Sequence, residues 1–361
     1  MKVLHIINSL HTGGAEKLII SILPLLKKRG VQVDLLLLNG GHTPFLEELQ
    51  KESTIHIHSL GQSVYNPLYI FKLIPYLKKY EIIHVHLFPA MYFVAIAKLL
   101  SFSKTKLIFT EHSTSNRRLQ NPVFRPLERI IYSFYSYVIC ISESVKIIMQ
   151  SKVGSRNNIY KVINNGIQIS RIDQAPGYER ADFKFNKRDK LICMVSAFRQ
   201  EKDHETVIHA LQVLPDYYKL LLVGAGERMD SIKDLARSQG VAERVTFFGI
   251  RSDVYSLLKM CDVAVLSSHW EGFGLAAAEA MACGIPTIAS NVDGLAQVVS
   301  GAGLLFEKGN ASDLATKIVA LQEKDLYLKI QEKCRERAKK YDLVTTVDEL
   351  QKLYISIVQH P

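Results

Sequence analysis

The sequence predicts two tandem α/β domains, each a doubly wound parallel sheet with helices on both faces. Short apolar runs rich in β-branched residues and leucine alternate with helical patterns along the chain, as expected of strands that are buried on both faces of a sheet. The alternation lapses over the polar residues 171–190 and then starts afresh. At 361 residues, the chain is also longer than one hydrophobic core usually supports.

The first predicted domain spans residues 1–170. Its predicted strands are residues 3–8, 33–38, 82–86, 107–112 and 137–142, and its predicted helices are residues 15–29, 67–79, 90–100 and 144–150. Most of these strands are followed by a helix, and such an order places consecutive strands in parallel.

The second predicted domain spans residues 171–343. Its predicted strands are residues 191–198, 219–224, 245–249, 263–268, 286–290 and 303–306, and its predicted helices are residues 202–214, 227–239, 254–260, 274–282 and 311–323. An amphipathic helix at 344–357 is expected to cross back, so that residues 344–361 join the first domain. Sheets of this kind bind ligands beyond the carboxyl ends of their strands, which is where the motifs below fall.

The positive charge is concentrated in the first half of the chain. Residues 1–170 contain 20 Lys and Arg against 9 Asp and Glu, whereas residues 171–361 contain 25 against 26. No helix-turn-helix, zinc-finger or aromatic-interleaved RNA-binding pattern accompanies the basic half, so no nucleic acid partner is expected. An anionic membrane surface is the expected partner. A basic surface that is merely solvated is the alternative.

The cysteines and the apolar runs indicate a cellular compartment. Five scattered cysteines form no CxxC pair, which is typical of a reducing, cytoplasmic environment. The sequence shows no signal-peptide pattern at its start. Its best membrane-spanning candidate, residues 87–100, is short and carries Lys98. We therefore expect a cytoplasmic protein, with peripheral attachment to the inner face of the cell membrane through the basic half.

The segment SSHWEGFGLAAAEAMACGIPTIAS, residues 267–290, carries the strongest chemical signal. It follows an apolar strand and opens a helix at Gly272 and Gly274, where free backbone amides and the helix dipole favour an anion. Glu271 and Glu279 are eight residues apart, about 12 Å along a helix axis. One carboxylate can thus bind a hydroxylated ring while the other binds a second ring across a diphosphate.

The segment SAFRQEKDHETVIHAL, residues 196–211, supplies cations at another strand end. Arg199 and Lys202 stand at a predicted helix start. Two cations that are three residues apart can neutralise a leaving diphosphate without a metal ion. An ordinary cationic helix entrance is the alternative interpretation.

The segment EGFGLAAAEAMACGIPTIAS resembles the E-x7-E signature of retaining glycosyltransferases of family 4, which have the GT-B fold. The resemblance implies two Rossmann-like domains that face a cleft. It implies that Glu271 binds the transferred sugar and that Glu279 binds the ribose of the nucleotide. It also implies that the amides of Phe273, Gly274 and Leu275 hold sugar hydroxyls and phosphate.

The segment around Arg199 and Lys202 resembles the G-R-x-x-x-E-K-G segment of the same family, which implies that this pair binds the diphosphate. The sequence departs from that pattern at two positions. Ala197 stands where glycine is usual, and Asp203 replaces the glycine after the lysine. Neither change removes a charged group, although the loop is expected to sit differently.

Several glycines follow predicted strands. The resemblance implies that Gly224, Gly249 and Ile250 contact the nucleotide base, while tight turns that bind nothing are an equal alternative. Gly13 and Gly14 lack the third glycine of a redox dinucleotide fingerprint. They resemble instead the GGAE loop of the family, which implies that the backbone approaches the donor phosphate there.

Histidines mark the strand ends of the first domain. His84 and His86 share one strand face, and His112 ends a later strand. No further ligand is spaced to join them, so a metal site is not expected. The resemblance places His112 near the C6 hydroxyl and the anomeric centre of the sugar, whereas structural roles remain open for His84 and His86.

Two further positions have plain structural alternatives. The resemblance places Ser142 near the cleft floor and Asn165 and Gly166 near the hinge. Ser142 could equally cap a helix, and a turn with positive φ explains Asn165 and Gly166 without a ligand.

The implied reaction is retaining hexosyl or N-acetylhexosaminyl transfer from a nucleotide diphosphate sugar, with a UDP-sugar favoured and no cofactor. The acceptor would be a saccharide or a polyprenyl-diphosphate-linked saccharide in polysaccharide biosynthesis. No D-x-D motif is present to hold a metal ion. A nucleotide-sugar epimerase or phosphorylase of the GT-B fold, or a non-catalytic sugar-nucleotide binding protein, remains an alternative. The sugar, the base, the acceptor and the linkage stay open.

Overall fold

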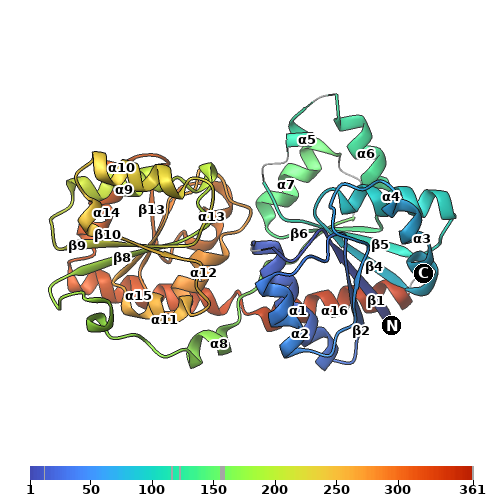
Figure 1. Cartoon of the computed structure of the whole chain (residues 1–361), viewed down its shortest axis with the longest axis horizontal. Coiled ribbons are helices and arrows are strands. Elements are labelled where there is room, and N and C mark those ends of the chain that lie inside the picture. Colours follow the sequence, from blue (N-terminus) through green and yellow to red (C-terminus); the bar gives the residue numbers. More distant parts are fainter. Residues whose placement is uncertain (12, 115–116, 122, 155–158, 360–361) are drawn as a thin grey trace. The chain divides into compact units, whose positions relative to one another are not determined.

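The chain forms two compact units (Figure 1), and the computed structural model describes residues 1–11, 13–114, 117–121, 123–154 and 159–359. Unit 1 comprises Met1–Gly166 and Leu343–Pro361, and unit 2 comprises Ile167–Asp342. The sequence predicts that the chain passes from one domain to the other after residues 170 and 343, and the bounds of the two units lie within a few residues of these positions.

Unit 1 contains a seven-stranded parallel sheet in the order β3-β2-β1-β4-β5-β6-β7. Its strands are β1 (Lys2–Ile7), β2 (Gln32–Leu37), β3 (Ile57–Ser59), β4 (Ile82–His86), β5 (Lys106–Glu111), β6 (Tyr137–Cys140) and β7 (Tyr160–Val162). All five residues of β4 are buried, including its two histidines.

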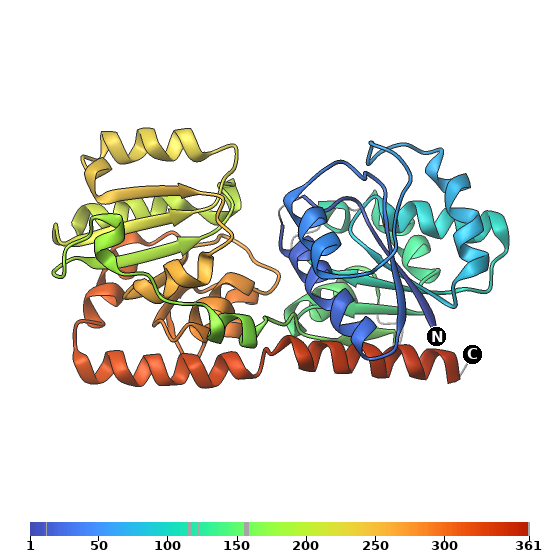
Figure 2. The ribbon, with the colours of Figure 1, turned by 60° about the horizontal axis from the view of Figure 1, so that its bottom comes forward.

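The helices of unit 1 come from both ends of the chain. They are α1 (Gly14–Lys28), α2 (Pro44–Glu52), α3 (Tyr69–Lys79), α4 (Ala90–Ser101), α5 (Arg117–Gln120), α6 (Arg125–Ser133), α7 (Glu143–Lys152) and α16 (Leu343–Gln359). Helix α16 packs beside α1 (Figure 2), and its apolar face joins the core of unit 1 through Val347, Leu350 and Tyr354. An ion pair of 2.5 Å between Arg29 Nη1 and Asp348 Oδ1 also connects it to the end of α1.

Unit 2 contains a six-stranded parallel sheet in the order β10-β9-β8-β11-β12-β13. Its strands are β8 (Lys190–Val195), β9 (Tyr218–Val223), β10 (Val245–Gly249), β11 (Val263–Leu266), β12 (Thr287–Ser290) and β13 (Leu304–Phe306). Its helices are α8 (Ile169–Gln174), η1 (Arg180–Phe183), η2 (Gln200–Lys202), α9 (His204–Val213), α10 (Met229–Ser238), η3 (Ala242–Arg244), α11 (Val254–Met260), α12 (Leu275–Ala282), α13 (Asp293–Val299), α14 (Ala311–Ala320) and α15 (Lys324–Lys339).

Some helices lie where the sequence shows no clear period. The polar stretch 171–190 contains most of α8 and all of η1. Helix α15 is strongly charged, and only Ile330, Cys334 and Ala338 of its 16 residues are buried. A stripe of one residue every four positions is too narrow to stand out from the charged background.

The strand order of each sheet reverses at one place. The reversal lies between β1 and β4 in unit 1 and between β8 and β11 in unit 2. Ligands of doubly wound sheets bind beyond the carboxyl ends of the strands at such a switch point. Gly13 and Gly14 follow β1, Arg199 and Lys202 follow β8, and Glu271 follows β11. His112 instead follows β5, the neighbour of β4.

Candidate active site

The loop after β8 carries both predicted cations. Arg199 is exposed in extended backbone, and Lys202 ends the 3-10 turn η2. Helix α9 begins only at His204, so the predicted start at residue 202 was two residues early. Both cations therefore lie in the connecting loop and not on the helix.

Asp203, the residue that departs from the family pattern, adopts a left-handed conformation with φ of +50°. Glycine adopts this conformation without strain, and Asp is among the few other residues that tolerate it. Its Oδ1 accepts a hydrogen bond from the Thr206 amide at 3.3 Å, and its Oδ2 accepts one from Thr206 Oγ1 at 2.6 Å. Asp203 thus compensates for the strain by capping α9.

The loop after β11 is fastened to the loop after β8. The buried hydroxyl of Ser267 donates to the carbonyls of Lys202 at 3.0 Å and Asp203 at 2.7 Å. The His269 amide donates to the carbonyl of Glu201 at 2.8 Å. These bonds hold the two segments with the predicted charged residues at the switch point of the sheet.

Lys202 and Glu271 form an ion pair across that switch point. Their side chains are 22% and 20% exposed. Partly hydrated ion pairs contribute little to stability, so the fold does not depend on this one. The lysine ammonium and the glutamate carboxylate can therefore separate from each other and bind a ligand instead.

Two glycines allow the Glu271 loop to lie where it does. Gly274 precedes α12 with φ of +93°. A Cβ on Gly294, at the start of α13, would lie 2.2 Å from the carbonyl oxygen of Glu271. Close approach of the two backbones therefore requires glycine at position 294, a role that the sequence did not reveal.

Glu279 lies on α12, beyond the loop. It is buried and accepts a hydrogen bond of 2.9 Å from the hydroxyl of Tyr255 on α11. Phe273 is buried against Tyr341, and Leu275 is the first residue of α12. The first amides of a helix have no intrahelical acceptor, so the predicted donors lie at the positive end of α12.

The glycines at the ends of β9 and β10 are required for different reasons. A Cβ on Gly224 would lie 2.0 Å from the Ser196 carbonyl oxygen, and its own φ is +140°. Gly249 has φ of +66°, and the Ile250 side chain that follows is 63% exposed. Packing explains Gly224 completely, whereas Ile250 lies on the surface where a ligand could reach its backbone.

The loop after β1 places its two glycines at a helix start. Gly13 is the N-cap of α1 in extended backbone, and Gly14 is the first residue of the helix. The Gly13 carbonyl accepts the Lys17 amide at 3.0 Å. This is the end of the strand that lies at the switch point of the unit 1 sheet.

The histidines of unit 1 lie closer together than the sequence suggested. His5 pairs in register with His84 across β1 and β4, and His86 Nδ1 lies 3.2 Å from His112 Nε2. Burial lowers the pKa of His5 to about 3 and that of His112 to about 4, and it holds the pKa values of His84 and His86 well below their usual range.

The expectation that no further ligand joins His84 and His86 was wrong. Among the described residues, His5, His84 and His86 form a group whose ligand atoms lie within 4.8 Å of one another, close enough to share a metal ion. No local pattern marks His5, because the register of β1 and β4, and not sequence spacing, brings it to the other two.

Two minor candidates have structural roles. The Ser142 hydroxyl caps α7 by accepting the Val145 amide at 3.3 Å. The expected positive φ at Gly166 is wrong, because its φ lies outside the left-handed range. A Cβ there would instead lie 2.5 Å from the Leu343 Cα. Glycine therefore allows the backbone at the end of the first segment of unit 1 to approach the start of its second segment.

Comparison with known proteins identifies the family. Residues 12–171 match the model described as Glycosyltransferase Family 4, and residues 178–341 match the model described as Glycosyl transferases group 1. The chain is a family 4 glycosyltransferase. Its two matches follow the two units and together include every predicted site residue.

Named relatives agree with this assignment. The glycosyltransferase is 29% identical over 269 residues to N-acetyl-alpha-D-glucosaminyl L-malate synthase of Bacillus anthracis. The matched region covers 71% of this chain and 69% of that protein. It is 26% identical over 300 residues to the UDP-Gal:alpha-D-GlcNAc-diphosphoundecaprenol alpha-1,3-galactosyltransferase of Escherichia coli. That match covers 78% of this chain and 76% of the Escherichia coli protein.

Solved structures show the same fold. Anabaena HepE in complex with UDP-glucose superposes with a TM-score of 0.86 at 23% identity, over 99% of this chain and 100% of that chain. The glycosyltransferase therefore has the GT-B fold, as the sequence resemblance implied.

Sequence reasoning missed three residues that shape the site of this glycosyltransferase. Tyr255 contacts Glu279 from a helix 24 residues earlier. Ser267 fastens the two loops, and its place directly after an apolar strand was the only available signal. The sequence showed no role for Gly294, because its contact with Glu271 is visible only in three dimensions.

Proposed function

We propose that this glycosyltransferase transfers a hexosyl or N-acetylhexosaminyl group from a nucleotide diphosphate sugar, with retention at the anomeric carbon. The acceptor is a saccharide or a polyprenyl-diphosphate-linked saccharide of cell-surface polysaccharide biosynthesis, such as capsule or lipopolysaccharide. The pairing of Lys202 with Glu271 carries the proposal. It brings a cation suited to a diphosphate and a carboxylate suited to sugar hydroxyls to one switch point.

Donor binding would exchange the partners of this ion pair. Lys202 and Arg199 would neutralise the diphosphate together with the positive end of α12. Glu271 would accept hydrogen bonds from the sugar and Glu279 from the ribose, while His112 contacts the sugar. Because two cations and the helix end neutralise the diphosphate, the proposed transfer needs no divalent metal ion.

The proposed chemical step breaks one bond and forms another. The bond between the anomeric carbon and the diphosphate oxygen breaks, and the acceptor hydroxyl oxygen bonds to the anomeric carbon. The hydroxyl proton passes to the departing diphosphate. The preorganised cations stabilise the negative charge that develops on the leaving group.

The relatives support a UDP-sugar donor and suggest two acceptor classes. The Escherichia coli relative is named for UDP-Gal and a diphosphoundecaprenol-linked acceptor, and HepE was crystallised with UDP-glucose. The Bacillus anthracis relative is named for L-malate, which favours a small-molecule acceptor as the second candidate.

A donor screen followed by product analysis tests the function. Thermal shift with UDP- and GDP-sugars should single out one donor, because a ligand at 100 times its Kd stabilises the folded state by about 2.7 kcal/mol. Labelled donor should then yield a glycosylated acceptor. A rearranged sugar would indicate an epimerase, a sugar phosphate a phosphorylase, and binding without turnover a non-catalytic protein.

A matched pair of variants tests the assignment of Glu279. Glu279→Gln should weaken UDP binding by about tenfold, the size of a hydrogen bond to a charged group. Glu336→Gln, on the exposed surface of α15, should not change the affinity. Equal UDP affinity of both variants in calorimetry would remove Glu279 from the site.

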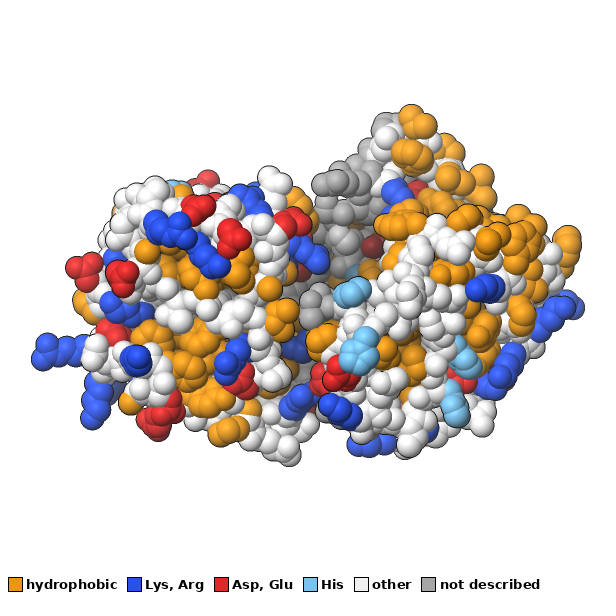
Figure 3. All heavy atoms as spheres, viewed as in Figure 1, with side chains coloured by type: hydrophobic (Ala, Val, Ile, Leu, Met, Phe, Trp, Pro, Cys, Tyr) orange, Lys and Arg blue, Asp and Glu red, His pale blue; other side chains and the backbone are white. Residues whose placement is uncertain are grey.

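Unit 1 has an apolar face that supports a membrane-associated acceptor. Figure 3 shows hydrophobic side chains gathered over α4 and α6. The exposed hydrophobic residues of this face lie at the end of α4, just before α6 and on α6. They are Leu99, Leu100, Phe102, Val123, Phe124, Leu127 and Ile130. Among the described helices, none has the length and apolar character that a membrane crossing requires. We propose that this face lies against the membrane surface.

The charges around the apolar face favour anionic lipid. Lys104 and Arg129 are exposed beside it, whereas the acid of α6, Glu128, is fully buried and bonded to Arg118 at 2.7 Å. Each basic residue near an anionic surface contributes about 1 kcal/mol. The five cysteines are free and buried, which supports the proposed location at the cytoplasmic face.

Vesicle flotation tests the membrane proposal. At low salt, the protein should float with vesicles that contain phosphatidylglycerol and much less with pure phosphatidylcholine. The double variant Leu127→Asn/Ile130→Asn should lose binding, whereas Val213→Asn/Val319→Asn, at exposed positions of unit 2, should retain it. Failure of the wild-type protein to float with anionic vesicles would contradict the proposal.

A further inference from the structure

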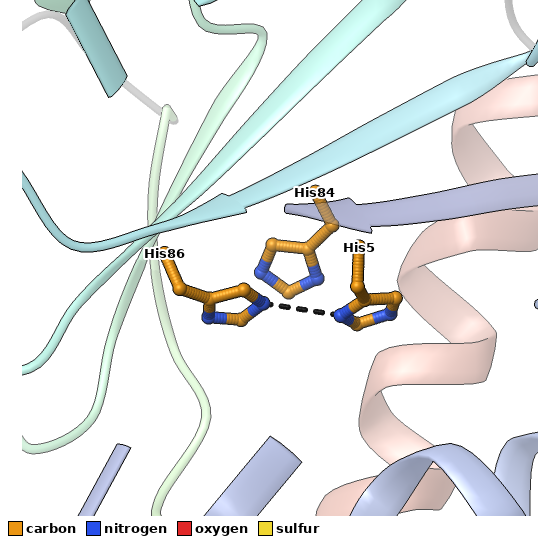
Figure 4. A group of neighbouring side chains, drawn as sticks. All are labelled: His5, His84 and His86. Atoms are coloured by element: carbon orange, nitrogen blue, oxygen red, sulfur yellow. Dashed lines mark hydrogen bonds between the residues drawn. The ribbon is translucent and has the colours of Figure 1, made fainter. Parts of the chain in front are cut away.

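Three histidine rings lie together at the switch point of the unit 1 sheet. Figure 4 shows His5, His84 and His86 converging from β1 and β4. Their exposed fractions are 0%, 1% and 1%. The rings of His84 and His86 have centroids 4.3 Å apart, and those of His5 and His86 are stacked at 5.3 Å. Buried polar rings require partners, and each ring has two nitrogens to satisfy.

These rings belong to one continuous chain of hydrogen bonds. It runs from His112 Nε2 to His86 Nδ1 at 3.2 Å, from His86 Nε2 to His5 Nδ1 at 3.1 Å, from His5 Nε2 to the Tyr354 hydroxyl at 3.2 Å, from that hydroxyl to His84 Nδ1 at 2.6 Å, and from His84 Nε2 to Thr110 Oγ1 at 2.6 Å. The chain uses every nitrogen of the three core histidines. It links α16, near the C-terminus, to His112 after β5.

The protons along this series of hydrogen bonds cannot be placed independently of one another. A neutral imidazole has one donor and one acceptor nitrogen, and burial favours the neutral form of all four histidines. Each neutral imidazole therefore passes the direction of one hydrogen bond on to the next. The buried Tyr354 hydroxyl passes it on as well, because accepting from both neighbours would leave its own O–H without an acceptor. A mixed arrangement would leave two buried lone pairs or two N–H groups facing each other, which is unfavourable.

The two links of Tyr354 indicate the direction. Hydrogen bonds donated by O–H groups are shorter than those donated by N–H groups. The hydroxyl lies 2.6 Å from His84 Nδ1 and 3.2 Å from His5 Nε2. A separation of 3.2 Å fits an N–H donor and is long for an O–H donor, so Tyr354 accepts from His5 and donates to His84. The 2.6 Å between His84 Nε2 and Thr110 Oγ1 is short for either direction and does not distinguish them. His112 then carries its proton on Nε2, and its Nδ1 is left as an acceptor.

We propose that Tyr354, His5, His84 and His86 form a relay that fixes the tautomer of His112, so that His112 Nδ1 accepts a hydrogen bond from a sugar hydroxyl. The last part rests on the proposed function, in which His112 contacts the sugar. Tyr354 and the three core histidines are positioning residues, because they act through His112. The His84 nitrogens already have partners at 2.6 Å, which favours the relay over a metal ion in the same cluster.

Nitrogen-15 NMR of histidine-labelled protein tests the relay without any substrate. The four histidines should all be neutral and carry the proton on Nε2. Tyr354→Phe keeps the aromatic ring but interrupts the series of hydrogen bonds, so His112 should lose its single tautomer. Tyr135→Phe removes another buried hydroxyl of unit 1, which donates to the Met91 carbonyl at 2.7 Å outside the chain, and should leave His112 unchanged. Thr110→Val provides a second cut at the far end.

Kinetics with the donor test the consequence. Tyr354→Phe should lower kcat/KM by about two- to tenfold, the effect of one neutral hydrogen bond, while the affinity for UDP, which has no transferred sugar, stays unchanged. A His112 proton on Nδ1 in the wild-type protein, a His112 spectrum insensitive to Tyr354→Phe, or stoichiometric zinc in the purified protein would overturn the relay. Coupled tautomers in a protein without transferase activity would leave the relay standing and refute only the proposed function.

Discussion

Replacing Lys202 with methionine separates the proposed catalytic role of this residue from its structural one. Methionine keeps an unbranched apolar stem and removes the ammonium group that pairs with Glu271. The backbone of the loop is unaffected, because Ser267 binds the carbonyl of residue 202 and not its side chain.

The structure predicts a large effect on turnover and a small one on stability. Both partners of the ion pair are about one fifth exposed, and pairs of this kind contribute about 0–1 kcal/mol. In a domain of this size such a change shifts Tm by no more than about 4 °C. Loss of one preorganised charge contact to the transition state costs about 3–4 kcal/mol, which is about a hundred- to thousandfold in kcat.

Steady-state transfer and differential scanning calorimetry should therefore disagree for Lys202→Met. Lys233→Met is the matched control, because Lys233 also forms an ion pair in unit 2, with Asp230 on α10, yet lies away from the switch point. It should show the same small change in Tm and full activity. A Lys202→Met enzyme with wild-type kcat, or one that loses activity only by unfolding, would refute the reasoning.

Three further predictions follow from the same geometry. Asp203→Ala should destabilise the protein by about 1–2 kcal/mol in urea unfolding and Asp203→Gly by only a few tenths, because glycine tolerates the left-handed conformation. Gly294→Ala should lower kcat/KM at least about tenfold, since its methyl group would displace the Glu271 loop; unchanged kinetics would contradict that contact. Burial lowers the pKa of His84, so stability should fall as pH drops below about 6.5, by up to about 1.4 kcal/mol per pH unit for each such histidine. His84→Gln should flatten this slope, whereas the exposed His42→Gln should not.

The sequence predicted the elements that depend on local pattern. Continuous apolar strands such as β4 and β11 stand out because both of their faces are buried, and glycines marked the turns that follow them. The charged residues of the candidate site were predicted for the same reason, since Arg199, Lys202 and Glu271 all follow such strands. Which of these loops lie side by side depends on strand order, and strand order is set by long-range packing.

The errors have a common physical cause. His5 was overlooked because a lone histidine inside an apolar strand has no local meaning until register places it beside His84. Gly166 was explained by its own backbone conformation, whereas its actual role is a contact with Leu343, 177 residues later. Local conformation can be inferred from neighbours in sequence, but a contact between distant segments cannot.

In the proposed function, the switch points of unit 2 and unit 1 solve different chemical problems with different residues. A diphosphate is charged, so its partners must be charged as well, and an empty site must keep those charges hydrated or paired; Lys202 and Glu271 meet both conditions. A sugar hydroxyl is neutral, and orienting it requires a fixed dipole whose direction does not fluctuate. Buried neutral histidines provide such a dipole, because the low dielectric strengthens each hydrogen bond and makes a reversed link costly. Burial would be damaging for the charged pair at the switch point of unit 2, whereas in the proposed relay it is what makes His86 and His5 effective behind His112.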